Sequence, residues 1–277
     1  MRAGLVQITA SDDPAANLPV TLALVREAAR DGADLVLTPE VTNIVSASRT
    51  RQREVLCAED EDPTLAGLRE VAAETGIWLS IGSLALTSDD PEGRFVNRSF
   101  LVGPDGGIRA RYDKIHMFDV ALGEGETYRE SAGYRPGEEA VLAETPWGKI
   151  GLTICYDMRF GALYRALAEA GAVILTAPSA FTVPTGEAHW HVLLRARAIE
   201  TGCFMLAAAQ WGHHKASRGR VRETYGHSLA VDPWGRVIAD GGTGSGVTYA
   251  ELDLGKVAEV QGKIPSLANA RAFSGPL

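Results

Sequence analysis

The stretch Lys149-Ile-Gly-Leu-Thr-Ile-Cys-Tyr-Asp-Met-Arg-Phe160 is the part of the sequence from which the fold is best worked out. Its apolar run Ile150–Ile154 predicts a buried strand, and residues 160–170, with leucines four apart, predict a helix. Cys155 therefore lies at a strand-to-helix turn, which exposes the sulfur beside backbone N–H groups of the helix start. This is the position of a nucleophile. The alternative is a small buried core residue, a common role of cysteine.

Two further predicted strands end at charged residues. Leu35-Val-Leu-Thr-Pro-Glu40 is a short apolar strand that ends in a carboxylate, and Ile108-Arg-Ala-Arg-Tyr-Asp-Lys-Ile-His116 carries Lys114 near its end. Amide hydrolysis needs a nucleophile, a proton carrier and a group that stabilises an oxyanion. Cys155, Glu40 and Lys114 have these chemical types. Taken singly, Glu40 could cap a helix and Lys114 could form a surface ion pair.

The rest of the chain indicates one layered α/β domain over residues 1–277, because apolar strands are joined by helices and hairpins. The pattern leaves open one doubly wound sheet or two packed sheets. Four segments are predicted to be irregular, namely the polar rim of the site at 42–62, the loops at 117–137 and 178–186, and a mobile polar segment at 213–221. A helix is predicted from Glu187 to Thr201.

Composition narrows the functional classes. The net charge of −8 argues against a nucleic-acid surface. Three cysteines without paired spacing suit a reducing compartment, so we expect a cytoplasmic protein. The sequence begins directly with a predicted strand, so no signal peptide is expected. No apolar run approaches the ~20 residues of a membrane span.

Glutamate, lysine and cysteine, each at the end of a strand and in this order, resemble the pattern of the nitrilase superfamily of carbon–nitrogen hydrolases. The resemblance implies a four-layer α-β-β-α sandwich with two packed mixed sheets. It also implies a homodimer or larger homo-oligomer, in which the tail from Leu254 packs on the partner subunit. A narrower resemblance, to the branch that cleaves deaminated glutathione, rests on Tyr112–Asp119, Ala180–Gly186, Ala188–Trp190, Leu194–Glu200 and Tyr225–Ser228.

The resemblance implies a mechanism without cofactor or metal. Cys155 would attack the amide and form a thioester, and Glu40 would carry the protons, a task that suits a carboxylate whose pKa burial has raised toward neutrality. Lys114 and the backbone N–H of Tyr156 would stabilise the oxyanion. A second glutamate that orients the lysine matches Glu130. Two neighbouring carboxylates compete for that role, namely Glu124 and Glu126.

Substrate contacts are expected from Arg159, Phe181 and Thr185. In related carbamoylases the arginine at the position of Arg159 contacts the substrate carboxylate, and a structural ion pair is the alternative. Phe181 and Thr185 could line the pocket or pack their loop. The resemblance is weaker after Phe160, where the family usually has Pro-Glu and this chain has Gly161-Ala162.

The resemblance implies a small carboxylate-bearing amide as substrate, with deaminated glutathione, cleaved to 2-oxoglutarate and cysteinylglycine, as the first candidate. Hydrolysis of 2-oxoglutaramate (ω-amidase activity) or of a carbamoyl amide is the alternative. Two other functional classes are kept as alternatives, namely a non-catalytic scaffold or signalling protein on a hydrolase fold and a metallohydrolase.

The histidines do not predict a metal site. His189 and His191 are two apart in a predicted helix and point to different faces. His213 and His214 lie in a polar segment and are expected to be solvated. His227 could pair with Cys155 as in cysteine proteases, but nothing in its neighbourhood supports this pairing.

Overall fold

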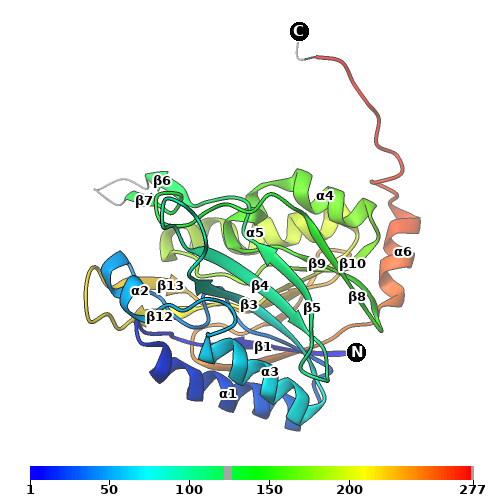
Figure 1. Ribbon diagram of the computed structural model, residues 1–277. Helices are drawn as coiled ribbons and strands as arrows, with labels where there is room; N and C mark the ends of the chain where they lie inside the picture. The colour runs from blue at the N-terminus through cyan, green and yellow to red at the C-terminus, as the bar shows by residue number, and fades with distance from the viewer. Residues whose placement is uncertain (122–126, 276–277) are drawn as a thin grey trace.

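The computed structural model describes residues 1–121 and 127–275. Two six-stranded sheets form the centre of the molecule (Figure 1). The first has the order β16 (Gly246–Glu251), β1 (Arg2–Gln7), β2 (Leu35–Leu37), β3 (Trp78–Leu86), β4 (Val96–Val102), β5 (Ile108–Asp113). The second has the order β15 (Val237–Asp240), β14 (Leu229–Val231), β11 (Phe204–Ala207), β10 (Ala172–Thr176), β9 (Gly148–Leu152), β8 (Val141–Thr145).

Helices cover the outer face of each sheet. Figure 1 shows α1 (Pro14–Arg30) and α3 (Pro63–Thr75) along one side of the sheets, and α4 (Gly161–Glu169) and α5 (Val183–Thr201) along the other. The protein is therefore a four-layer α-β-β-α sandwich, as the sequence resemblance implies. Among the described residues, none of the helices combines the length and the apolar character needed to cross a membrane.

Side chains along the strands of the first sheet alternate between two cores, one between the two sheets and one beneath the helices α1 and α3. Leu35 and Leu37 belong to the core that includes the second sheet, whereas Val36 between them packs in the core that includes α1 and α3. Successive side chains of a strand point to opposite faces. Both faces are covered, so all three residues of β2 are buried. Each such aliphatic side chain contributes about 2 kcal/mol by leaving water.

The predicted strand and helix around Cys155 are confirmed with shifted ends. The strand β9 ends at Leu152, the 3₁₀ helix η1 (Cys155–Arg159) follows, and α4 begins at Gly161. A Cβ atom at Gly161 would lie 2.9 Å from Nη1 of Arg197, so the side chain of Arg197 occupies the space beside this helix start.

Three predicted irregular segments are wrong in part. The rim segment contains the helix α2 (Arg49–Val55). The loop at 117–137 contains β6 (Asp119–Ala121) and β7 (Thr127–Arg129), which pair. The segment at 213–221 lies between the paired strands β12 (Trp211–His214) and β13 (Arg222–Tyr225), and β12 includes its first two residues.

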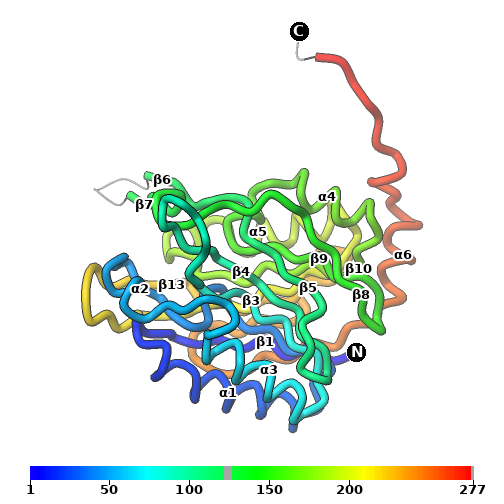
Figure 2. The backbone as a smooth tube through the Cα atoms, in the orientation of Figure 1, coloured from blue at the N-terminus to red at the C-terminus, as the bar shows by residue number. Residues whose placement is uncertain are grey.

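The helix α5 begins at Val183, four residues before the predicted start, with a proline in its first turn. Proline suits this position because the N–H groups in the first turn of a helix have no carbonyl partner within the helix, so the N–H that proline lacks is not needed there. Thr185 is therefore helical. Near the other end of the chain, α6 (Gly255–Lys263) packs on the body through Val257 and Val260, and the tube in Figure 2 shows the following residues leading away from it.

Candidate active site

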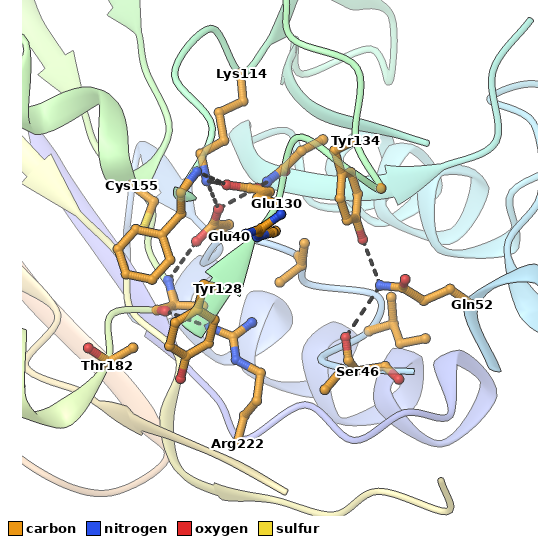
Figure 3. Close-up of a pocket in the computed structure, with 18 of the residues that line it drawn as sticks. Glu40, Ser46, Gln52, Lys114, Tyr128, Glu130, Tyr134, Cys155, Thr182 and Arg222 are labelled. Carbon is orange, nitrogen blue, oxygen red and sulfur yellow. Dashed lines mark hydrogen bonds and ion pairs between the residues drawn. The ribbon is translucent and has the colours of Figure 1, made fainter. Parts of the chain in front are cut away.

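The three predicted catalytic residues meet at one end of the two sheets. The strands β2 and β3 are parallel, and β5 runs in the same direction because β3–β4 and β4–β5 are antiparallel. Glu40 and Lys114, which follow β2 and β5, therefore leave the sheet at the same edge. Cys155 follows β9 in the facing sheet, and Figure 3 shows its side chain beside those of Glu40 and Lys114.

A glycine allows the loop that carries Glu40 to pack closely on its own sheet. A Cβ atom at Gly82, in β3, would lie 2.0 Å from the carbonyl oxygen of Thr38 and 2.5 Å from that of Pro39. No side chain fits there. The loop is also tied to the segment that follows β11 of the second sheet, because Nε2 of Gln210 donates to the carbonyl oxygen of Glu40 at 3.0 Å.

Lys114 lies between two carboxylates. Its Nζ is 2.9 Å from Oε1 of Glu40 and 2.9 Å from each carboxylate oxygen of Glu130. The Lys114 side chain is 2% exposed, so it does not form a surface ion pair. Glu130 also accepts from the backbone N–H of Phe118 at 2.6 Å. The structure therefore brings Glu130 to the lysine; the competing Glu124 and Glu126 lie outside the described residues.

The Glu40 carboxylate is held by groups from both sheets. Its Oε2 accepts from the backbone N–H of Ala180 at 2.8 Å, and Oε1 accepts from the side-chain amide of Asn97 at 2.9 Å. The Cys155 thiol interacts with the same carboxylate. These contacts do not cap a helix. They place the carboxylate between the thiol and the ammonium group.

The charges in the cluster reverse the expected pKa shift of Glu40. Burial raises the pKa of this carboxyl, but the attraction of Lys114, with hydrogen bonds from Lys114, Cys155 and Ala180, outweighs burial and leaves the pKa below its ordinary value. Burial also disfavours charged Lys114, but Glu130 and Glu40 hold its pKa well above the ordinary value. Glu40 is therefore ionised in the resting site, and its pKa is not raised toward neutrality.

The thiol of Cys155 is protonated in the same site. Burial, and then the charge of Glu40, raise the pKa of the thiol far above its ordinary value, and the opposite effect of Lys114 is smaller. Cys155 has a left-handed backbone with φ 49°, a strained conformation for a residue with a side chain. Its own N–H donates to the carbonyl oxygen of Pro178 at 2.9 Å. Tyr156, the predicted oxyanion donor, is the next residue in η1.

The buried carboxylate of Asp157 fixes the turn after Cys155. One oxygen accepts from the N–H of Ile154 at 2.8 Å and from the hydroxyl of Tyr112 at 2.6 Å. The other lies 3.0 Å from the N–H of His116. This carboxylate therefore ties the nucleophile turn to the segment that carries Lys114.

A pocket of about 400 Å³ opens onto Cys155, a volume typical of small-molecule sites. Phe181 and Thr185 line it, as predicted. Part of the predicted rim also lines it, including Arg49 and Gln52 of α2. Gln52 donates to the hydroxyl of Tyr134 at 2.8 Å, as Figure 3 shows.

Arg159 lies beside the pocket. Its guanidinium is 5.5 Å from the ring centre of Phe181, which lines the pocket, and 5.7 Å from that of Tyr156. Its Nη2 is 3.2 Å from Nδ1 of His189. Among the described residues Arg159 forms no ion pair with an acid, and its contact with a substrate carboxylate stays a prediction.

The sequence analysis did not identify the cations that line the pocket. Four arginines line it, namely Arg49, Arg129, Arg220 and Arg222. Asn97 was also missed, although a polar residue in the middle of a strand whose neighbours are nearly all buried was a signal. The arginines gave no comparable signal, because arginine is common on surfaces.

The histidines occupy places that their spacing did not predict. His191, His227 and Asp240 bring ligand atoms within 4.8 Å of one another, and each imidazole has a nitrogen 2.9 Å from an oxygen of Asp240. His227 therefore contacts Asp240, not Cys155. His214 was expected to be solvated, but it is buried. Its Nδ1 lies 2.7 Å from the carbonyl oxygen of Ala10, and its Nε2 lies 2.7 Å from Oγ1 of Thr224.

A buried glutamate, lysine and cysteine at one end of two packed sheets define a class of hydrolases that act on carbon–nitrogen bonds. Comparison with known proteins agrees: the chain belongs to the carbon-nitrogen hydrolase family, whose family model matches residues 2–261. It is an amidase-type member of the nitrilase superfamily, as the relatives show.

Two curated relatives and one solved structure illustrate the similarity. The deaminated glutathione amidase of Yersinia enterocolitica is 40% identical over 88% of this chain and 84% of its own length. The omega-amidase NIT2 of Mus musculus is 37% identical over 98% of this chain and 95% of its own. The C. elegans NitFhit protein superposes with a TM-score of 0.88 at 33% identity; the match covers 98% of this chain and 65% of that one.

Proposed function

We propose that this protein hydrolyses deaminated glutathione to 2-oxoglutarate and cysteinylglycine through a thioester on Cys155. The observation that carries the proposal is the position of Glu40, which accepts a hydrogen bond from Lys114 and whose charge acts on the Cys155 thiol in the same pocket. A base in contact with a protonated nucleophile can take its proton as the nucleophile attacks.

In the first half of the reaction, the sulfur of Cys155 attacks the amide carbonyl carbon while its proton passes to Glu40. Lys114 and the N–H of Tyr156 stabilise the negative oxygen, and one such donor contributes about 3–4 kcal/mol. Glu40 then gives its proton to the amide nitrogen, the C–N bond breaks, and cysteinylglycine leaves.

In the second half, a water molecule attacks the thioester while Glu40 takes one of its protons. The C–S bond breaks, the proton returns to the sulfur, and 2-oxoglutarate leaves. In this mechanism Glu130 holds Lys114 in place, since it contacts Nζ through both oxygens.

The pocket's arginines favour an anionic substrate with more than one carboxylate. Deaminated glutathione carries one on its acyl part and one on its dipeptide part. A glutamine-derived 2-oxo amide, 2-oxoglutaramate, carries only the first, and the similarity to the mouse omega-amidase makes it the second candidate. Hydrolysis of a carbamoyl amide is the further alternative.

The direct test measures 2-oxoglutarate released from deaminated glutathione and from 2-oxoglutaramate, for the wild type and Cys155→Ala. The proposal predicts a higher kcat/KM for deaminated glutathione and no turnover by the variant. A preference for 2-oxoglutaramate would move the assignment to ω-amidase, and full activity of Cys155→Ala would refute the mechanism.

The proposal includes a cytoplasmic homodimer. Two large apolar side chains on α5 face solvent, with Val192 65% and Ile199 50% exposed, and Phe273 in the tail is 90% exposed. A second copy of this chain that packs on α5 and on the tail would cover them. Light scattering of the purified protein tests this, and a monomer at micromolar concentration would contradict it.

A further inference from the structure

Arg222 brings a positive charge into the pocket that no anion of the protein compensates there. It is the first residue of β13, is half-buried and lines the pocket, yet no carboxylate of the described residues lies within ion-pair distance of it. Its Nε is buried and has no hydrogen-bond partner among those residues. Burying a cation is costly unless an anion compensates its charge. The pocket therefore favours a ligand that places an anionic group beside Arg222.

The other arginines near the site have different surroundings. Water reaches the three that line the pocket with Arg222, namely Arg49, Arg129 and Arg220. Arg159 lies beside the pocket in η1, which begins at Cys155, and the sequence resemblance implies that it contacts the carboxylate on the acyl side of the substrate. The proposed substrate has a second carboxylate, on its dipeptide part, and Arg222 is the half-buried cation that remains for it.

A single residue links Arg222 to the catalytic carboxylate. The N–H of Ala180 donates to Oε2 of Glu40 at 2.8 Å, and the carbonyl oxygen of Ala180 accepts from Nη2 of Arg222 at 3.2 Å. The guanidinium carbon also lies 5.8 Å from the ring centre of Tyr128. Figure 3 shows Arg222 reaching from below toward Glu40. The guanidinium is therefore held in place one residue away from Glu40.

The side of the pocket next to Glu40 is where the leaving group must lie. In the proposed mechanism Glu40 gives its proton to the amide nitrogen, so this nitrogen lies within hydrogen-bond reach of the Glu40 carboxylate. The dipeptide that leaves begins at the same nitrogen and spans at most about 7 Å when extended. That length lets its terminal carboxylate reach Arg222, and a guanidinium binds a carboxylate by paired hydrogen bonds.

We infer that Arg222 binds a carboxylate on the leaving-group side of the scissile amide, which in the proposed substrate is the C-terminal carboxylate of cysteinylglycine. This inference rests on the proposed function and deepens it. 2-Oxoglutaramate cannot make the contact, because its leaving group is ammonia. Arg222 therefore favours deaminated glutathione over 2-oxoglutaramate, whereas the acyl group that both substrates share keeps the contact expected from Arg159.

The test compares deaminated glutathione with its C-terminal amide, which lacks only the charge of the leaving-group carboxylate. The wild type should prefer the carboxylate, and Arg222→Met should lower the ratio of the two kcat/KM values about 10- to 100-fold, as expected for lost hydrogen bonds between charged groups. Arg222→Lys should keep part of the preference. Turnover of 2-oxoglutaramate by Arg222→Met should stay close to that of the wild type.

Arg49→Met is the matched control, because Arg49 lines the same pocket but is exposed, and this variant should keep the wild-type ratio. An unchanged ratio in Arg222→Met, or an equal fall in Arg49→Met, would overturn the inference. An equal loss for all three substrates in Arg222→Met, with wild-type thermal unfolding, would also overturn it, because Arg222 would then act on Glu40 through Ala180.

A wild type that cleaves 2-oxoglutaramate but not deaminated glutathione would instead contradict the proposed function, and the reverse of the leaving step then decides. 2-Oxoglutaramate supplies the acyl group on Cys155, and the amine of alanylglycine attacks the thioester. The C–N bond forms, the C–S bond breaks, and a proton passes from the nitrogen to the sulfur. The inference requires faster capture by alanylglycine than by alanylglycinamide, measured by mass spectrometry, and loss of this difference in Arg222→Met. Equal capture by the wild type would overturn it.

Discussion

Asn97 donates its side-chain N–H to Oε1 of Glu40 at 2.9 Å, and this is the same oxygen that accepts from Nζ of Lys114. The amide also lies 3.5 Å from Oε1 of Glu130. With Nδ2 turned toward both carboxylates, Oδ1 is left buried without a partner among the described residues. Asn97 therefore acts as a positioning residue that holds the two glutamates around one lysine.

Replacing Asn97 by leucine should lower kcat by about 10- to 100-fold with little change in KM, because a hydrogen bond to a charged group contributes about 1.5–3 kcal/mol. Loss of this donor should also raise the pKa of Glu40, so the acid limb of kcat/KM should move to higher pH. Steady-state kinetics across pH check both effects. Wild-type kcat with an unmoved limb would show that Asn97 only fills space.

The pH profile of the wild type tests the charge state of Glu40. Activity requires its carboxylate, which is present above its pKa and lost as pH falls through it, and Lys114 holds that pKa below its ordinary value against the effect of burial. The pKa of Lys114 lies well above its ordinary value, so the ammonium keeps its charge in the alkaline range. We therefore expect kcat/KM to be flat from about pH 5.5 to 9. An acid limb near pH 6–7 would contradict the assignment and favour a carboxyl with a raised pKa.

Glu40→Gln should separate thiol reactivity from amide turnover. The charge of Glu40 raises the pKa of Cys155 and Lys114 lowers it, so removing the carboxylate should lower the thiol's pKa and preserve or speed alkylation by iodoacetamide at pH 7. Turnover should fall about 10²–10⁴-fold, the usual contribution of a general base. Peptide mass spectrometry measures alkylation. If alkylation disappears together with turnover, Glu40 has a structural role instead.

The close packing under Glu40 predicts a stability effect. Gly82→Ala should lower the free energy of unfolding by about 1–3 kcal/mol and reduce activity, because its Cβ would displace the backbone at Thr38 and Pro39. Gly262→Ala in α6, where a Cβ meets nothing within 4 Å, is the matched control and should stabilise by about 0.5–1 kcal/mol. Equal denaturation midpoints for the two variants would contradict this packing.

Much of this site could be predicted because the ends of strands can be recognised in the sequence. Glu40, Lys114 and Cys155 each follow an apolar or alternating run, and the resemblance supplied the pairing of the two sheets and Glu130. The pKa direction expected for Glu40 was wrong for a physical reason. Burial can be inferred from the sequence, whereas the 2.9 Å contact with Lys114 joins two residues that are 74 positions apart.

The substrate contacts were less predictable. Arg159 was expected to contact the substrate because the matching arginine does so in related carbamoylases, and η1 turns its side chain onto His189 and the pocket-lining Phe181. Arg222 lies 67 positions beyond Cys155, at the end of a segment expected to be mobile, and pairing of β12 with β13 brings it into the pocket. Substrate contacts depend on where loops and hairpins lie in the fold, and no local sequence pattern predicts that placement.

The proposed mechanism requires that Cys155 carries the acyl group. We would mix the enzyme with deaminated glutathione, quench with acid during turnover, and measure the intact mass and the modified peptide. We predict a 2-oxoglutaryl thioester on Cys155, the same adduct from 2-oxoglutaramate, and no adduct in Cys155→Ala. Turnover by Cys155→Ala, or an adduct on Cys57 or Cys203 in place of Cys155, would contradict it.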